Sequence, residues 1–202
     1  MHFNLHIIKI NNFLKIAQYK DMKRKSKITF FISFFILTAL IVGSAILYTN
    51  IRYPLKYEAE ISKYSQQYAL DKALVCSLIN EESSFNKDAI SNRGAKGLMQ
   101  LSSKTAKFIA DELGEEYKEE KLFDVDTNIK YGCFYLNYLR QKFVDEVVYL
   151  SAYNAGESTL RLWLKDEKTS KNGVTLSNIP FSQTKEYVTK IIQGRKLYKG
   201  RI

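Results

Sequence analysis

A glutamate at the end of an apolar helical pattern is the first candidate for chemistry in this sequence. One helix face, with i, i+3, i+4, i+7 spacing, is formed by Val75, Leu78, Ile79 and Glu82. A carboxyl group on such a face loses hydration, and its pKa rises because burial disfavours the charged form. A general acid must stay protonated near neutral pH, so Glu82 is the candidate general acid.

Two other carboxylates lie close to Glu82 in the sequence. Glu81 is turned about 100° away on the same helix, nearer Ser77, and we expect it to be solvated. Asp88 follows in the loop after Phe85 and is the one candidate for a second catalytic carboxylate. We expect Asp88 to have a surface role, which leaves Glu82 without a carboxylate partner.

Two further segments are expected to frame this glutamate. Residues 91–101 read SNRGAKGLMQL, and glycines in such a turn let the backbone approach a ligand closely. Residues 151–156 read SAYNAG, which closes a helix with Ala155-Gly156 and presents Tyr153 and Asn154.

Four motifs in register resemble the signature of the soluble-lytic-transglycosylase catalytic domain. The first motif contains ESSF at 82–85, Ala89, Ser91 and GAKGLMQ at 94–100, and it continues with Thr105-Ala106. The second is a middle helix with Asp126, Asn128-Ile129, Gly132 and Tyr135-Leu136. The others are AYNAG at 152–156, and IPF at 179–181 with Tyr187-Val188. The similarity covers roughly residues 56–198, and the order and spacing of four motifs make it specific.

The resemblance implies an all-α, lysozyme-like fold and an enzyme that acts on peptidoglycan glycan strands. In that family the glutamate of the first motif, here Glu82, protonates the oxygen between MurNAc and GlcNAc. It then acts as a base while the sugar's own C6 hydroxyl closes a 1,6-anhydro ring, so that water is not consumed. The resemblance implies no cofactor and no metal.

The same resemblance implies which residues bind the substrate. Met99 and Gln100 would line the sugar cleft, and Ser91 would form a hydrogen bond near the N-acetyl group. Tyr153 would place its hydroxyl close to Glu82, with Asn154 supporting that corner. For Met99 and Tyr153, ordinary core packing is the alternative interpretation.

The sequence departs from the family pattern at two places. Ser102 and Ser103 stand where a proline usually follows GLMQ, and a serine there caps a helix equally well. Gln183-Thr184-Lys185 stands where Glu-Thr-Arg is common. If the family's glutamate reaches the stem peptide, Gln183 retains a hydrogen bond but loses the charge, so the departure concerns peptide preference rather than glycan cleavage.

Composition excludes several other wall-cutting chemistries. The two histidines are His2 and His6, both ahead of the apolar segment discussed below. A domain beyond that segment has no histidine for a zinc amidase or a Cys-His peptidase. Two alternatives remain on the same fold: a lysozyme-like hydrolase, which would need a second carboxylate, and an inactive wall-binding module, which would have lost its acid.

The first structural element that the sequence predicts is a membrane anchor near the N-terminus. Residues 28–49 read ITFFISFFILTALIVGSAILYT and contain no charged residue. A segment of this length can span a bilayer as a helix. A basic cluster ending at Lys27 precedes it and predicts a cytoplasmic N-terminus. We therefore expect a single-pass protein of the cell membrane with its catalytic domain outside. The competing interpretation is a signal peptide that is cleaved near the small residues Gly43-Ser44-Ala45.

The N-terminal segment accounts for most of the net charge. Residues 1–51 carry seven Lys or Arg side chains and one Asp, a net +6 out of the total of +10. This asymmetry is a topology signal, and we expect no nucleic-acid partner. We interpret 1–27 as a cytoplasmic segment. Its first 21 residues are either a genuine tail or untranslated, since Met22 begins a complete signal-anchor pattern.

The remaining chain reads as a short connector and one all-α domain. The connector is expected at 50–56 and the catalytic domain at 57–202. Helical spacing recurs in 57–69, 72–83, 104–113, 128–143, 145–153, 157–164 and 183–198. Asp71 and Asp126-Thr127 are expected N-caps, Gly114 a C-terminal stop, and 165–178 a surface loop. Cys76 and Cys133 are expected to be buried free thiols, with a disulfide as the alternative.

Overall fold

The computed structural model describes residues 2–202, with side chains described from Leu14 onward. Met1, the first residue of the expected cytoplasmic segment, lies outside the described residues. The chain divides into two compact units, residues 1–51 and residues 52–202.

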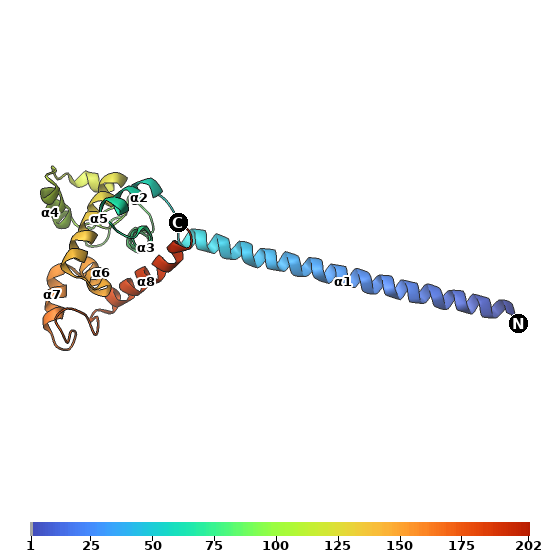
Figure 1. The fold of residues 1–202 in the computed structure, drawn as a ribbon. Coiled ribbons are helices and arrows are strands. Elements are labelled where there is room, and N and C mark those ends of the chain that lie inside the picture. The colour runs from blue at the N-terminus through green and yellow to red at the C-terminus, as the bar shows by residue number, and fades with distance from the viewer. Residues whose placement is uncertain (1) are drawn as a thin grey trace. The chain divides into compact units, whose positions relative to one another are not determined.

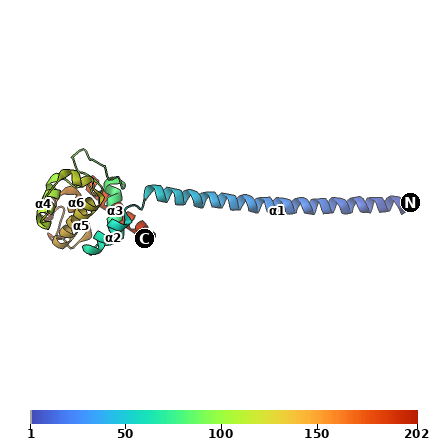
Figure 2. The ribbon, with the colours of Figure 1, turned by 90° about the horizontal axis from the view of Figure 1, so that it is seen from above.

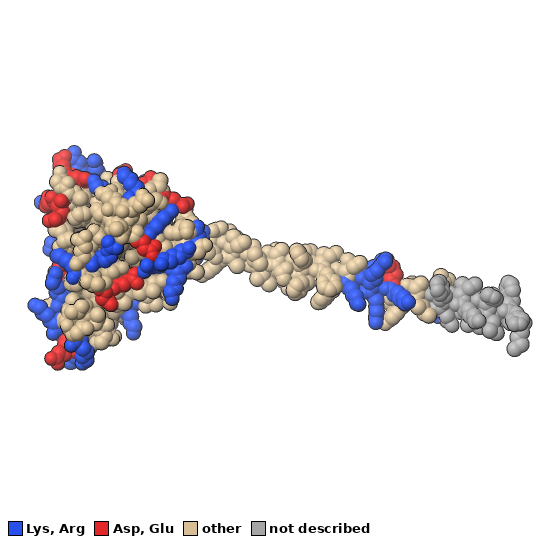
Figure 3. All heavy atoms as spheres, in the orientation of Figure 1, with Lys and Arg blue, Asp and Glu red and all other residues tan. Residues whose placement is uncertain are grey.

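The first unit is almost entirely one helix. Helix α1 (His2–Arg52) contains the whole uncharged stretch expected at 28–49. From Leu14 to Arg52 it is long and apolar enough to cross a membrane, and none of its most apolar window is buried in the protein. In Figure 3 the C-terminal part of this helix is a continuous tan surface, and basic side chains gather on its N-terminal side.

The second unit is a bundle of short helices, shown in two views in Figures 1 and 2. They are α2 (Glu58–Gln67), α3 (Lys72–Ser83), α4 (Ser103–Leu113), the 3₁₀ helix η1 (Glu119–Phe123), α5 (Val125–Lys142), α6 (Glu146–Ala155), α7 (Glu157–Lys165) and α8 (Ser182–Lys199). The described residues contain no β-strand, only isolated bridges between Ile90 and Lys96 and between Lys96 and Leu101. The all-α expectation is confirmed, whereas η1 was not expected.

Local capping explains most of the helix boundaries. The side chains of Asp71 and Ser102 accept hydrogen bonds from Ala73 N (2.9 Å) and Thr105 N (3.1 Å). Gly114 ends α4 with a left-handed φ of 67°. The cap expected at Asp126-Thr127 is instead Asp124, whose carboxylate accepts from Thr127 N at 2.9 Å.

Asp126 serves a tertiary contact that sequence spacing did not reveal. Its carboxylate accepts hydrogen bonds from Tyr64 Oη at 2.6 Å and from Lys63 Nζ at 2.9 Å. This contact ties the start of α5 to α2.

Helix α3 lies at the centre of the second unit. Every residue from Ala73 to Asn80 is buried, and the helix packs most extensively against α8. Apolar burial of this kind is the main favourable contribution to folding. Cys76 and Cys133 are both fully buried and both free, which confirms the interpretation as thiols rather than a disulfide.

The segment after α1 is bound to the helical unit rather than extended from it. Arg52 O accepts a hydrogen bond from Asn80 Nδ2 at 3.2 Å, and Pro54 O accepts one from Tyr198 Oη at 3.0 Å. Leu55 and Tyr57 pack against the core. The connector expected at 50–56 therefore contacts the helical domain from Arg52 onward.

Candidate active site

Glu82 lies in the last turn of α3, where the chain turns sharply. Ser84 and Phe85 both adopt left-handed backbone angles, with φ of 51° and 62°. Such conformations are costly for non-glycine residues and persist where the surrounding structure holds them. Here the Phe85 ring is buried in the core, so the turn is held directly beyond Glu82.

The carboxyl group of Glu82 is desolvated and has one strong hydrogen bond. Burial raises its pKa to about 7, from the ordinary value of 4.5. The hydroxyl of Tyr187 on α8 donates to Glu82 Oε1 at 2.6 Å, which lowers the pKa, and the charge of Glu81 raises it. Burial has the largest effect. About half of the Glu82 side chains are therefore protonated at pH 7, which is the proton that a general acid requires.

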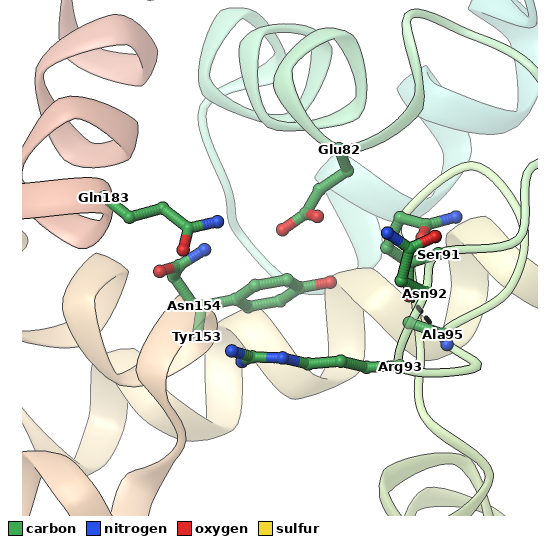
Figure 4. A pocket seen from close by; sticks show the side chains of 9 residues that line it. Glu82, Ser91, Asn92, Arg93, Ala95, Tyr153, Asn154 and Gln183 are labelled. Carbon is green, nitrogen blue, oxygen red and sulfur yellow. Dashed lines mark hydrogen bonds between the residues drawn. The ribbon is translucent and has the colours of Figure 1, made fainter.

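A cavity of about 390 Å³ opens beside this carboxyl group (Figure 4). Its walls come from the end of α3, the loop after it, the end of α6 and the start of α8. The lining residues are Glu82, Ser91, Asn92, Arg93, Ala95, Gln100, Tyr153, Asn154 and Gln183. Among them Glu82 is the one carboxylate and Arg93 the one cation. The cavity is thus polar, with many neutral hydrogen-bonding groups around a single acid.

The loop that forms one wall is held by an asparagine from α5. Asn128 is 1% exposed, and its Oδ1 accepts from Met99 N at 2.8 Å. Its Nδ2 donates to Lys96 O at 3.1 Å and to Leu122 O at 2.7 Å. Gly97 passes so close that an added Cβ would lie 2.2 Å from both Asn128 Nδ2 and Leu122 O. The requirement for glycine at this position comes from packing as well as from its φ of 77°.

Ser91 and Gln100 lie at the two ends of this wall. Ser91 Oγ accepts from Ala95 N at 3.0 Å and closes a tight turn. Gln100 has a left-handed φ of 48°, and its amide donates to Gly97 O at 2.9 Å and Ala89 O at 3.2 Å. Both side chains reach the cavity while bracing the loop.

Tyr153 and Asn154 come from the last turn of α6 and form the opposite wall. Figure 4 shows the Tyr153 ring across the cavity from Glu82. Its hydroxyl donates to Met99 O at 2.9 Å, and burial raises its pKa well above the ordinary value. Asn154 Oδ1 accepts from Thr184 Oγ1 at 2.8 Å. Thus Thr184, the residue of Gln183-Thr184-Lys185 that matches the family's Glu-Thr-Arg, orients a cavity residue.

Two residues, Met99 and Glu81, have other surroundings in the structure than the sequence predicted. Met99 does not line the cavity: its side chain is 0% exposed and packs against Gly132, where a Cβ would lie 2.1 Å from the Met99 sulfur. Only its backbone carbonyl serves the site, through Tyr153. Glu81 is not freely solvated: its side chain is 18% exposed and pairs with Lys190 at 3.4 Å, because α8 covers that side of α3. Asp88 is 64% exposed beside Lys87, as expected for a surface residue.

Sequence reasoning gave no role to several groups that the fold brings to Glu82 or to the cavity. Tyr187 was part of a quoted motif, yet nothing in its spacing revealed a contact with Glu82, 105 residues away. Asn92 and Arg93 lie inside the Gly-rich segment, and no sequence pattern marks them as cavity residues, because polar residues are common in turns.

The fold and the site together define a helical, lysozyme-like domain with a single desolvated carboxyl group in a polar cavity. The chain belongs to the transglycosylase SLT domain family, whose family model matches residues 59–175.

Named relatives and solved structures agree with this assignment. The chain is 30% identical over 165 residues to the soluble lytic murein transglycosylase of Salmonella typhimurium, covering 80% of this chain and 26% of that protein. It is 29% identical over 169 residues to the membrane-bound lytic murein transglycosylase C of Serratia proteamaculans, covering 72% of this chain and 47% of the relative.

Among solved structures, the chain is similar to lytic transglycosylase Slt of Pseudomonas aeruginosa, described as an inactive variant with glutamate replaced by glutamine. The TM-score is 0.68 at 30% identity, over 76% of this chain and 25% of that one. The chain thus spans about a quarter of the length of the soluble relatives it matches.

Proposed function

We propose that this protein is a peptidoglycan lytic transglycosylase with Glu82 as its sole acid and base. The observation that carries the proposal is the Glu82 carboxyl: it is desolvated, has a pKa of about 7, and opens onto a polar cavity large enough for sugars. Membership of the SLT domain family supports the same reaction.

The proposed reaction uses one carboxyl group twice. Protonated Glu82 gives its proton to the oxygen between MurNAc and GlcNAc, and the bond from MurNAc C1 to that oxygen breaks. The resulting Glu82 carboxylate then removes the proton of the MurNAc C6 hydroxyl. That oxygen bonds to C1 and closes a 1,6-anhydro ring, which restores the protonated acid.

Tyr187 is placed to assist the second half of this cycle. Its hydroxyl donates to Glu82 Oε1 at 2.6 Å, so it stabilises the carboxylate after the proton has left. Asn154 and Gln183 stand at the same side of the cavity, where they would bind the N-acetyl groups or the stem peptide. Since Gln183 has no charge, we propose that it binds the stem peptide by a hydrogen bond.

A hydrolase on this fold would need a second carboxylate to activate water. Glu81 and Glu186 lie in a neighbouring hollow beside Glu82, and both pair with Lys190, at 3.4 Å and 2.9 Å. Asp88 is exposed and pairs with Lys87. None of the three lines the larger cavity, which favours the intramolecular reaction. The intact acid likewise argues against an inactive wall-binding module.

Mass spectrometry of digested sacculi tests the proposal. The wild-type protein is expected to release anhydro-muropeptides, and Glu82→Gln is expected to release none while remaining folded. Glu81→Gln, which neutralises the adjacent carboxylate in the same helix, is the matched control and should keep most of the activity. Release of reducing muropeptides would establish the hydrolase instead. If Glu81→Gln lost its activity and Glu82→Gln kept it, the assignment of the acid to Glu82 would be wrong.

We further propose that residues 28–49 anchor the protein in the cell membrane as a single span, with residues 1–27 inside and the catalytic domain outside. The apolar surface of α1, the basic cluster before it and the membrane-bound name of one relative support this. Protease added to intact spheroplasts should then degrade the catalytic domain, and protection of that domain would reverse the topology.

The anchoring proposal limits which strands the enzyme reaches. Arg52, the last residue of α1, is hydrogen-bonded to Asn80, two residues before Glu82. Only two residues, Asn50 and Ile51, separate the proposed anchor at 28–49 from the helical unit in the sequence, so the chain tethers the catalytic glutamate to the membrane on a short connection. We therefore propose that it cuts glycan strands lying next to the membrane.

A further inference from the structure

One surface of the helical unit gathers basic side chains where the connector packs along the end of α8. Arg201 Nη1 donates a hydrogen bond to Tyr53 O, and Tyr198 Oη donates one to Pro54 O at 3.0 Å. Burial raises the pKa of the Tyr198 hydroxyl, and the charges of Arg201 and Arg52 both lower it. The two guanidinium groups therefore lie near the same hydroxyl, on one side of the unit.

Exposed apolar side chains lie beside these guanidinium groups. Leu197 is 45% exposed and Ile202 is 42% exposed. The chain keeps a helix-like turn to its end, since Arg201 N and Ile202 N both donate to Tyr198 O, at 2.9 Å and 3.2 Å. At that spacing Leu197 and Arg201 share one side of the helix. Lys56 in the connector is exposed as well. We call this surface the connector face; it consists of Arg52, Lys56, Leu197, Arg201 and Ile202.

Two cations of the connector face have no carboxylate partner. Within residues 14–202 neither Arg52 nor Lys56 forms an ion pair, and the Arg52 guanidinium lies over the Tyr53 ring at 5.1 Å from its centroid. Lys199, on another side of α8, is instead paired with Asp71 at 3.3 Å. A surface cation without a partner keeps its attraction for anions outside the protein.

The connector face follows the proposed anchor directly in the sequence. Thr49 ends the uncharged segment, and Arg52 comes three residues later. An extended chain spans at most about 3.6 Å per residue, so these three residues bridge at most about 11 Å. This is close to the Debye length of about 8 to 10 Å at physiological ionic strength. Arg52 therefore stays within the range at which charges on the membrane surface act on it.

A lipid surface matches the composition of the connector face better than an acidic protein segment would. Lys and Arg side chains are attracted to anionic head groups, and Tyr53 is of a residue type that is common at the membrane–water interface. Apolar side chains such as Leu197 and Ile202 can enter the same interface. An acidic protein segment would pair the cations but would leave these two apolar side chains in water.

We propose that the connector face binds the surface of a membrane that contains anionic phospholipids, and that this contact holds the helical unit against the bilayer in one orientation. The inference rests on the proposed anchoring of residues 28–49 and is independent of the reaction at Glu82. It concerns the catalytic domain itself, beyond the helix that spans the bilayer.

A fluorescent probe on the connector face tests the proposal. Cys76 and Cys133 are fully buried, so a cysteine that replaces Leu197 can be labelled selectively. The full chain with Leu197→Cys carries an environment-sensitive dye and is placed in nanodiscs of phosphatidylcholine, either alone or with about one third phosphatidylglycerol. In the anionic nanodiscs we expect the emission to shift to shorter wavelength. Quenching by lipids that carry a spin label on the head group should increase by about twofold.

Two matched controls accompany this measurement. Replacing both Arg52→Gln and Lys56→Gln should remove most of the increase in quenching, whereas Lys168→Gln with Lys171→Gln, which removes two charges from the exposed loop after α7, should leave it unchanged. The same dye at Leu162→Cys, 68% exposed on α7, should not respond to lipid composition. Figure 1 shows α7 and the end of α8 on opposite sides of the helical unit.

The comparison between probes, lipids and variants decides the proposal. Equal quenching at Leu197→Cys in the two kinds of nanodisc would overturn the connector face as a lipid-binding surface while leaving the anchor in place. An equal loss in the two doubly substituted variants would also overturn it, because overall charge would then attract the lipid. A chain that stays outside the nanodiscs would refute the anchor and this inference together, and muropeptide release by the chain in detergent would still test the proposed reaction.

Discussion

Replacing Glu82 by glutamine should stabilise the protein at alkaline pH while abolishing its activity. The ordinary pKa of a glutamate is 4.5, and that of Glu82 in the folded protein is about 7. The folded state therefore holds this proton more tightly than the unfolded chain does. Stability contributed by the protonated form is fully present below pH 4.5 and is lost as pH rises through about 7.

The size of the effect follows from the difference between the two pKa values. At about 1.4 kcal/mol for each pKa unit, ionising Glu82 in the folded protein costs about 3 kcal/mol. Glutamine keeps the shape and the acceptor for the Tyr187 hydroxyl but does not ionise. Glu82→Gln should therefore match the wild type near pH 4 and exceed it by about 3 kcal/mol at pH 8.

Trp163 provides the assay, because it is the sole tryptophan and is buried in the helical unit. Its fluorescence during urea unfolding of the full chain in detergent gives the free energy of unfolding at each pH. Glu112→Gln on the exposed face of α4 is the control and should change stability by less than about 0.5 kcal/mol at both pH values. An equal gain for Glu82→Gln at pH 4 and pH 8, or no gain at pH 8, would refute the claim that Glu82 is desolvated.

Three further predictions concern the residues that hold the site. Tyr187→Phe removes the hydroxyl that stabilises the Glu82 carboxylate, so the pKa of Glu82 should rise further. The fall in the rate of muropeptide release on the alkaline side of the pH profile should then move to higher pH by about one unit. A fall at the same or at lower pH would contradict this. Asn128→Ala removes three hydrogen bonds to backbone groups, of which Lys96 O keeps its bond from Leu101 N, and should cost about 3 kcal/mol in urea unfolding. A loss below about 1 kcal/mol would show that water replaces the amide. Gly97→Ala should lower the melting temperature more than Gly94→Ala does. Both glycines have a positive φ, but only at Gly97 do atoms lie within 2.2 Å of the added Cβ. Equal losses of melting temperature would mean that backbone strain alone sets the cost.

Much of the fold was predictable because its determinants are local. The apolar spacing in 72–83 matches α3 residue for residue, and Asp71, Ser102 and Gly114 fix their helix ends through their own side chains or backbone angles. The start of α5 was misplaced by two residues because Asp124 and Asp126 are equally good caps by composition. What separates them is the distant Tyr64, which binds Asp126.

The sequence by itself determined the helical class, the apolar N-terminal helix and the identity of the candidate acid, since periodicity and motif order depend on neighbours along the chain. Only the tertiary structure decided what surrounds that acid. It brought Tyr187 to Glu82, turned Met99 into the core and covered Glu81 with α8. These outcomes depend on how α3, α5 and α8 pack, and packing depends on shape complementarity between distant segments, which no local pattern encodes.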